Sequence, residues 1–172
     1  QCGRRQSRSL THPRTMVPDL SVQKRVHIIG VGGAAMSAIA SIARKMGHVV
    51  TGSDQVALPV LDRLRAEGCV VWSPHDPARL PVDIDVVAIS TAVKDDNPEL
   101  VAVRARGVPV ATRPDVMESL GRLKRTVAVS GTAGKTTTSA MLAVIAAAAG
   151  WRPSMIVGST VEGLGPGVDW TD

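Results

Sequence analysis

Aromatic residues are almost absent from this sequence, which has no phenylalanine, no tyrosine and only three tryptophans. Proteins that bind single-stranded nucleic acid stack the bases on aromatic side chains, and this chain lacks such a platform. The net charge is +5, but Arg4, Arg5, Arg8 and Arg14 all lie within the first fourteen residues, and the rest of the chain is nearly neutral. We therefore expect no nucleic-acid partner.

Metal-binding residues are also scarce. The two cysteines, Cys2 and Cys69, are too far apart to suggest a zinc knuckle or a disulfide framework. His27, His48 and His75 lie on or beside predicted strands without the spacing of metal ligands, and we expect them to be structural. These absences argue against a metal-cluster or disulfide-rich protein and favour a reducing, cytoplasmic location.

Long apolar runs are missing as well. The longest, residues 140–149, is about half of what a membrane-crossing helix needs, and no apolar stretch follows the basic start as in a secretory signal. We expect no membrane partner. The chain begins at Gln1 and ends soon after the glycine-rich segment 163–167, so we expect a piece of a longer protein. Residues 1–23 show no apolar periodicity and are predicted to form a disordered basic arm.

Short apolar runs alternate with helical patterns in the rest of the chain. Residues 26–29, 49–52, 69–72 and 85–90 are predicted to be buried strands, and the segments between them have apolar residues at helical spacing. This alternation predicts a parallel sheet with helices on both faces. We expect an α/β fold: a Rossmann-like domain at 24–112, a linker at 113–124, and the start of a P-loop α/β ATP-binding domain at 125–172.

A glycine loop follows the first predicted strand. Gly30, Gly32 and Gly33 would let the backbone approach a diphosphate, and the next helix would present unpaired amides and the positive end of its dipole. The loop also fits the dinucleotide fingerprint in its alanine-ending form, with Asp54 about twenty residues later, where an acid could bind ribose hydroxyls. By itself this pattern is also compatible with a nicotinamide or flavin enzyme, or with a turn that serves helix packing alone.

A second glycine loop, residues 131–138, follows the apolar run 126–130, which we expect to be a strand. Its amides could surround a phosphate, Lys135 supplies a counter-charge, and the Thr136 hydroxyl could bind magnesium. Val129 stands where the usual Walker pattern has its first glycine, so this loop is a variant. Two phosphate loops in one chain indicate an enzyme that couples two phosphorylated ligands.

With both loops considered, the sequence resembles the amino-terminal part of a Mur ligase, a family of ATP-dependent amino-acid ligases of peptidoglycan precursor synthesis. The similarity covers about residues 24–165. It is carried by residues 27–37, 52–54, 90–93 with 96–99, and 131–138. The last segment is shared with folylpolyglutamate synthetases, whereas the first, with its Gly-x-Gly-Gly-x-x-Met-Ser pattern, is most similar to the branch that adds L-alanine to UDP-N-acetylmuramate.

The resemblance implies ATP and Mg²⁺ as cofactors and UDP-N-acetylmuramate and L-alanine as substrates, joined through an acyl phosphate. It implies a UDP-sugar site of Gly30, Gly32, Gly33, Ala34, Ala35, Met36, Ser37, Asp54, Ser90 and Thr91. It implies an ATP site of Gly131, Thr132, Ala133, Gly134, Lys135, Thr136 and Thr137. Within that site Lys135 and Thr136 would be catalytic, and Thr136 would also be the magnesium ligand.

Two positions depart from the family's pattern: Ala35 stands where members usually have glycine, and Ala133 where they usually have histidine. The family's acidic metal-binding segment and carboxy-terminal domain would lie beyond residue 172, so we expect no ligation by this chain alone. Three alternatives remain open. They are the branch that recycles a preformed tripeptide, which usually has a cysteine in the first loop, a NAD-binding oxidoreductase or regulatory domain, and a non-catalytic binding module.

Overall fold

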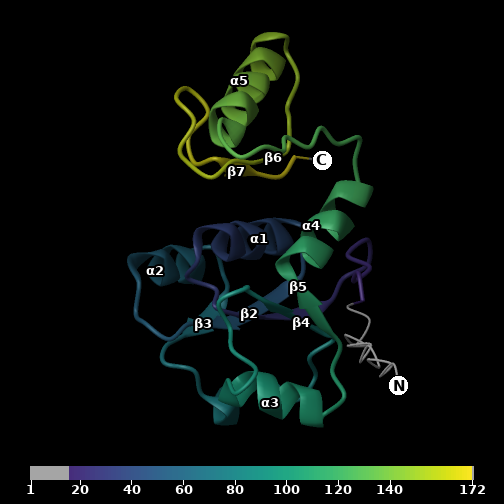
Figure 1. The fold of residues 1–172 in the computed structure, drawn as a ribbon, viewed down its shortest axis with the longest axis vertical. Coiled ribbons are helices and arrows are strands. Elements are labelled where there is room, and N and C mark those ends of the chain that lie inside the picture. Colours follow the sequence, from purple (N-terminus) through teal and green to yellow (C-terminus); the bar gives the residue numbers. More distant parts are fainter. Residues whose placement is uncertain (1–15, 172) are drawn as a thin grey trace, which may run out of the picture.

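The computed structural model describes residues 16–171. It contains a five-stranded sheet flanked by helices and, above the sheet in Figure 1, a smaller unit made of one helix and a two-stranded ribbon. The sheet confirms the predicted Rossmann-like α/β fold of the first part of the chain. Within the described range, no helix is both long enough and apolar enough to span a membrane.

The strands of the sheet are β1 (Arg25–Ile29), β2 (Val49–Ser53), β3 (Val70–Trp72), β4 (Val86–Ile89) and β5 (Val110–Thr112). They all pair in parallel, in the order β3-β2-β1-β4-β5. The chain moves outward from β1 through β2 and β3, and then returns to the other side of β1 for β4 and β5. The loops after β1 and β4 therefore meet where the strand order reverses, which is where open α/β sheets bind their ligands.

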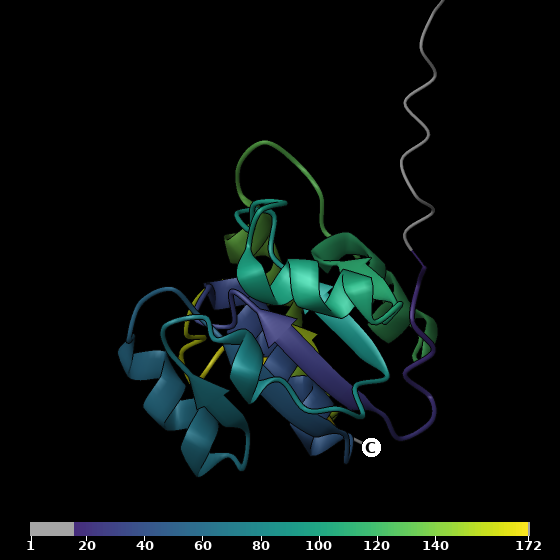
Figure 2. The ribbon, with the colours of Figure 1, turned by 90° about the horizontal axis from the view of Figure 1, so that it is seen from below.

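The helices that pack on the sheet are α1 (Ala34–Lys45), α2 (Pro59–Ala66), α3 (Pro98–Ala105) and α4 (Arg113–Arg122). Figure 1 shows α1, α2 and α4 on one face and α3 on the other, and Figure 2 shows the α3 face from below. Side chains of β1 alternate between the two: Val26 and Ile28 belong to the core under α1, whereas Ile29 belongs to the core under α3. Both faces of the sheet are thus buried, as its apolar strands require.

Local sequence explains where α3 begins. The Asn97 side chain caps the helix by accepting hydrogen bonds from two amides of the first turn, and Pro98 occupies the first helical position. The cap fixes Glu99 in the first turn of α3, where it is fully buried against the sheet. The predicted proline-initiated helix is therefore present, and it carries a buried acid.

Some residues of the expected arm pack against the first unit. Residues 16–23 belong to the expected arm, yet Leu20 is buried in the core under α1. The Ser119 hydroxyl in α4 donates a hydrogen bond to the Pro18 carbonyl. This segment packs because Leu20 gives it one apolar anchor. The rest of the expected arm, residues 1–15, lies outside the described residues.

Most of the segment expected to be a linker is a helix that packs on the sheet. Residues 113–122 form α4, which begins with a capping box between Thr112 and Asp115. Val116 and Leu120 are buried in the same core as α1. Because these apolar side chains face the sheet, α4 belongs to the first unit rather than connecting it flexibly to the second.

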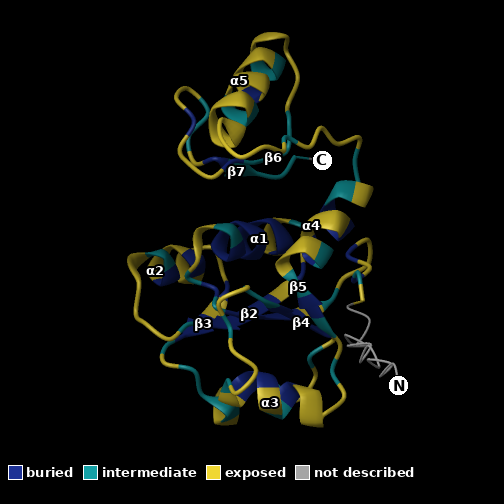
Figure 3. Ribbon diagram, in the orientation of Figure 1, coloured by how far each residue is buried: buried dark blue, intermediate teal, exposed yellow. Residues whose placement is uncertain are grey.

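The second unit consists of α5 (Lys135–Ala148), β6 (Met155–Ile156) and β7 (Val168–Asp169), the two strands being antiparallel. Ile156, Val168 and Trp170 pack against the core of the first unit, so the ribbon rests on α1. The helix α5 has only one buried residue, Ala143. Figure 3 shows this contrast between the mostly exposed α5 and the buried α1.

The strand expected at residues 126–130 is not formed. These residues have no regular secondary structure, and four of the five are exposed. A strand requires a neighbour whose main-chain groups pair with its own. No strand in the described part of the chain pairs with this segment. Of the predicted P-loop domain, the structure therefore contains the loop and its helix without the strand.

Candidate functional site

The first glycine loop, residues 30–33, leaves β1 where the strand order reverses. The amides of Gly30 and Val31 donate hydrogen bonds to the Ser53 carbonyl at the end of β2, at 2.8 and 3.0 Å. Gly30 has a φ of 81°, a left-handed conformation that other residues rarely adopt. A Cβ there would also lie 2.8 Å from the Ser90 Oγ in the loop after β4. Position 30 therefore requires glycine for two separate reasons.

The helix after this loop starts without a side-chain cap. Gly33 is the N-cap residue and makes no side-chain hydrogen bond. The first-turn amides, those of Ala34, Ala35 and Met36, consequently have no partner within the helix. Ala34 is exposed and Ala35 is half-buried, so this end of α1 is open to solvent. Free amides and the helix dipole together suit a phosphate.

Two predicted site residues turn their side chains elsewhere. Met36 is buried in the core under α1 and can offer a ligand only its amide. The Ser37 hydroxyl donates to the Ala34 carbonyl at 3.1 Å, and the Ser37 amide donates to the Gly33 carbonyl at 2.8 Å. Neither donor of Ser37 is free in this conformation. Of these two residues, only Met36 therefore keeps a main-chain amide available to a ligand in this conformation.

Asp54 and Ser90, two of the predicted site residues, lie beside the loop. The Asp54 Oδ2 accepts a hydrogen bond from the Gly32 amide at 2.8 Å, and a Cβ on Gly32 would lie 2.8 Å from that oxygen. The Ser90 amide donates to the Ile29 carbonyl at 3.3 Å, and Thr91 next to it is exposed. The Asp54 carboxylate already occupies the Gly32 amide and would repel an anion, so the first-turn amides of α1 are the better placed donors for a phosphate.

The second glycine loop is open to solvent, since residues 131–138 are all exposed. Gly134 is the N-cap residue of α5 and has a left-handed φ of 76°. The Lys135 ammonium donates to the Gly131 carbonyl and lies 3.4 Å from the Thr132 carbonyl oxygen. The lysine therefore already lies over its own loop, where phosphate oxygens could replace the two carbonyls.

The second loop fits a nucleotide better than it fits a metal ion alone. The first-turn amides of α5 and Lys135 suit phosphate, and Gly158 leaves room beside Thr136, since a Cβ on it would lie 3.5 Å from the Thr136 Oγ1. Across residues 16–171, no three His, Cys, Asp or Glu side chains gather as a metal site. Magnesium takes about six oxygen ligands, so Thr136 would supply one and phosphates and water the others.

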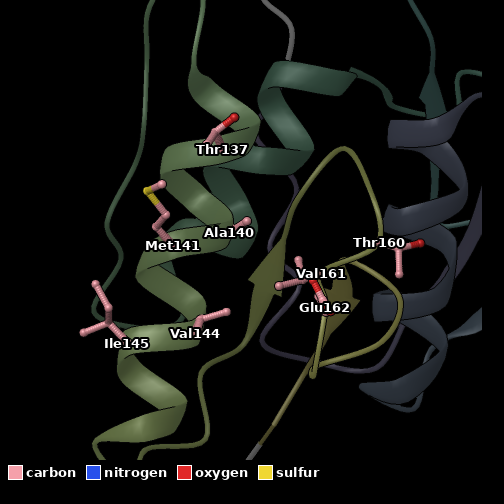
Figure 4. Close-up of a pocket in the computed structure, with 8 residues that line it drawn as sticks. All are labelled: Thr137, Ala140, Met141, Val144, Ile145, Thr160, Val161 and Glu162. Atoms are coloured by element: carbon pink, nitrogen blue, oxygen red, sulfur yellow. The ribbon is translucent and has the colours of Figure 1, made fainter.

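A cavity of ≈ 390 Å³ lies along α5, but it does not suit phosphate. Figure 4 shows Ala140 and Val144 on the side of α5 that faces Val161, with Met141 on the outer side. The lining is mostly apolar, and Glu162 adds a negative charge. The groups predicted to bind phosphate lie instead at the amino end of α5.

A buried polar cluster on the α3 face was missed by the sequence analysis. Its centre is the Glu99 carboxylate, which is 0% exposed. The Oε1 atom accepts hydrogen bonds from the Trp72 indole N–H at 3.0 Å and from the Asp76 amide at 2.8 Å. The Oε2 atom accepts from the Ser53 hydroxyl and lies 3.4 Å from the His27 Nε2. Each oxygen of this carboxylate therefore has at least two polar partners.

The surroundings of Glu99 keep it ionised. Burial by itself raises the pKa of this carboxyl, but the hydrogen bonds from His27, Ser53 and the Asp76 amide outweigh burial and lower the pKa to about 2. The His75 Nδ1 lies 2.8 Å from the Ser53 Oγ and extends the cluster toward the surface. In the sequence, the available signal was His27, a polar residue inside an apolar strand.

These features define a class of protein: an α/β unit with a glycine loop where its strand order reverses, followed by a Gly-Lys-Thr loop in front of a helix. The profile described as "Mur ligase family, catalytic domain" matches residues 25–125, more than half of the chain. The chain therefore belongs to the Mur ligase family, which confirms the resemblance seen in the sequence.

Three similar proteins agree with this assignment. The UDP-N-acetylmuramate–L-alanine ligase of Burkholderia cenocepacia is 40% identical over 144 residues, which is 84% of this chain and 31% of that protein. The structure of UDP-N-acetylmuramate-alanine ligase MurC from Thermotoga maritima superposes with a TM-score of 0.79 at 32% identity, covering 86% of this chain and 35% of the other. The UDP-N-acetylmuramate:L-alanyl-gamma-D-glutamyl-meso-diaminopimelate ligase of Neisseria meningitides gives 0.78 at 33% identity, covering 86% and 46%. The chain spans about a third of the length of the curated relatives it matches.

Proposed function

We propose that this chain is part of an ATP-dependent ligase that joins L-alanine to UDP-N-acetylmuramate in the cytoplasmic synthesis of peptidoglycan precursors. One observation carries the proposal: in a single Mur ligase chain, an uncapped helix start behind residues 30–33 is followed by a Gly-Lys-Thr loop in front of α5. The 40% identity to a ligase with that name supports the choice of substrates.

In the first unit, the diphosphate of the sugar nucleotide would bind the first-turn amides of α1. Gly30, Gly32 and Gly33 would allow it to approach the main chain. Asp54 would border the uridine ribose, and Ser90 with Thr91 would line the opposite side of the loop. The arrangement supports this assignment because the loops after β1 and β4 meet there.

In the second unit, the amides of residues 131–137 would surround the phosphates of ATP. When bound, ATP would supply the terminal phosphoryl group that converts the muramyl carboxylate into an acyl phosphate and leaves ADP; the amine of L-alanine would then displace phosphate to form the amide. Lys135 would exchange its carbonyl partners for phosphate oxygens and offset their charge, while Thr136 would give magnesium a hydroxyl ligand. Because Ala133 brings no imidazole, Lys135 and the metal would carry this task.

The first loop favours the alanine-adding branch over the tripeptide-recycling branch. The two solved ligases are almost equally similar in fold, with TM-scores of 0.79 and 0.78, so the fold does not separate them. The cysteine expected in the first loop of the recycling branch is absent from residues 27–37. Supplying the full-length enzyme with L-alanine or with the preformed tripeptide would distinguish the two, and preference for the tripeptide would reverse this choice.

Calorimetric titration of the 172-residue chain tests the first half of the proposal. UDP-N-acetylmuramate should bind, whereas NAD should give no heat above dilution, because the similar ligase acts on a UDP-sugar and a NAD-binding domain would leave the Gly-Lys-Thr loop without a role. We expect binding without ligation, since the chain spans about a third of its relatives. Binding of NAD in place of the UDP-sugar would support an oxidoreductase or regulatory domain instead.

A further inference from the structure

Ser53 joins the buried cluster to the first glycine loop. Its carbonyl accepts the amides of Gly30 and Val31, and its hydroxyl donates to the Glu99 carboxylate on the α3 face. Both Ser53 and Glu99 are 0% exposed, so water cannot substitute for either contact. The position of Ser53 is therefore coupled to the loop on one side and to a buried charge on the other.

A second route leads to the same loop through Trp72. The Trp72 indole N–H donates to Glu99 at 3.0 Å, and the Trp72 carbonyl accepts from the Asp54 amide at 3.1 Å. Asp54 in turn accepts the Gly32 amide at 2.8 Å. The two routes reach different loop residues, because Ser53 holds Gly30 and Val31 whereas Asp54 holds Gly32.

We infer that Glu99 is a positioning residue for the first glycine loop: from the opposite face of the sheet it fixes Ser53 and Trp72, and through them the main chain of residues 30–32. The inference rests on the proposed function, because loop geometry matters to catalysis only if this loop binds the diphosphate. Glu99 itself touches no ligand in this account.

The charge of Glu99 is essential to this role. Ser53, Trp72 and the Asp76 amide donate to its two oxygens, with a His27 ring nitrogen at 3.4 Å, and a carboxylate offers acceptors only. Glutamine at this position would turn an NH₂ group toward one of these donors and leave it unsatisfied. The other charged or titratable groups near the cluster are His75, with its Nδ1 3.5 Å from the Glu99 Oε2, and Arg79, stacked over the Trp72 ring at 5.0 Å.

Two substitutions test the inference in the 172-residue chain. Glu99→Gln disturbs both routes, whereas Ser53→Ala removes one hydroxyl and leaves the contacts of Glu99 with Trp72 and the Asp76 amide in place. Glu118→Gln is the matched control, since Glu118 is about half exposed and pairs only with Arg122 on the surface of α4. The readouts are amide hydrogen exchange by NMR without ligand, and UDP-N-acetylmuramate affinity by calorimetry.

Glu99→Gln should speed exchange at Gly30, Val31 and Gly32 at least tenfold relative to residues 26–29 of β1. Ser53→Ala should do so at Gly30 and Val31 but spare Gly32. Both should weaken UDP-N-acetylmuramate binding about tenfold, and Glu118→Gln should change neither readout. If Glu99 only stabilised the fold as a whole, Glu99→Gln would instead raise amide exchange uniformly along the sheet.

Unchanged or uniformly raised exchange in folded variants would overturn the positioning role. If Glu99→Gln does not fold, Ser53→Ala decides the question alone, because it keeps the buried carboxylate and most of its donors. Failure of the unmodified chain to bind UDP-N-acetylmuramate would contradict the proposed function instead. The exchange pattern, which needs no ligand, separates these two failures.

Discussion

The two glycine loops of this chain lead into helices that differ in burial. In the first, the Gly30 and Val31 amides are fixed on the neighbouring strand, and most of α1 is buried. In the second, residues 131–138 are exposed, the segment before them is unpaired, and α5 has one buried residue. The first glycine loop is thus preorganised by the sheet, whereas the second is held within this chain mainly by its own lysine.

This difference has a consequence for binding. A preformed loop loses little conformational freedom when a ligand arrives, whereas an open loop must be ordered at the cost of part of the binding free energy. We therefore expect the first unit to bind its ligand more tightly than the second, when both are measured on this chain.

The largest effect is expected at the second loop, where Lys135 is the principal cation. In a full-length enzyme, Lys135→Ala should reduce ATP-dependent ligation by about 10³-fold or more, because a preorganised charge is lost from the transition state. UDP-N-acetylmuramate binding should be intact. Lys24→Ala, at the amino end of β1 and away from both loops, serves as the control. Steady-state turnover and calorimetry measure the two effects, and unchanged turnover would contradict the role of the loop.

The next largest effect is expected on stability, from truncating a buried rather than an exposed leucine. Leu120 in α4 is 4% exposed, whereas Leu142 in α5 is 42% exposed. Leu120→Ala should lower the free energy of unfolding by about 2–5 kcal/mol, and Leu142→Ala should change it by about 0.5 kcal/mol or less. Urea denaturation followed by circular dichroism measures both. Equal losses of unfolding free energy would mean that the two helices are equally well packed, and would contradict the contrast between α4 and α5.

The buried Glu99 carboxylate should make the unfolding free energy of the chain depend on pH. Because the folded-state pKa of Glu99 is lowered from 4.5 to about 2, its contribution is fully present above pH 4.5 and is lost as the pH falls toward 2. Its size is about 3 kcal/mol. The difference in unfolding free energy between the unmodified chain and Glu99→Gln should therefore shrink over this interval. A difference that stays constant from pH 5 to pH 2.5 would argue against an ionised, hydrogen-bonded Glu99.

The smallest effect is expected from two glycines that share a left-handed conformation. Gly30 has a φ of 81° and a Cβ there would meet Ser90, whereas Gly47 has a φ of 89° and open space around it. The left-handed conformation alone makes alanine cost about 1–2 kcal/mol of stability at either position, and the contact with Ser90 adds to this cost at position 30. Only Gly30→Ala should also weaken UDP-N-acetylmuramate binding, by about tenfold, or about 1.4 kcal/mol. If Gly47→Ala weakens binding equally, the loop is not the site.

Much of the first unit was predictable because its signals are local. Apolar runs that end in glycine predicted the strands, and Asn97 followed by proline predicted the start of α3. The glycine spacing predicted the loop, and the structure placed Asp54 and Ser90 beside it. These features depend on neighbours in sequence or on the regular geometry of parallel sheets.

The remaining features depend on contacts between distant segments. Nothing near Leu20 or Val116 in sequence shows that both reach the same core, so the sequence could not assign their segments to the first unit. The expected strand at residues 126–130 had the right composition but no paired neighbour in the described chain. The cluster around Glu99 draws its partners from residues 23 to 72 positions away, which no local pattern reveals.

The central claim, two separate phosphate sites with different ligands, is tested most directly by NMR titration of the isotopically labelled 172-residue chain. UDP-N-acetylmuramate should shift the amides of residues 30–36, Asp54, Ser90 and Thr91 and leave residues 131–137 unchanged, and magnesium with ATP should do the reverse. Shifts at residues 131–137 on adding the UDP-sugar, or none at residues 30–36, would contradict the account.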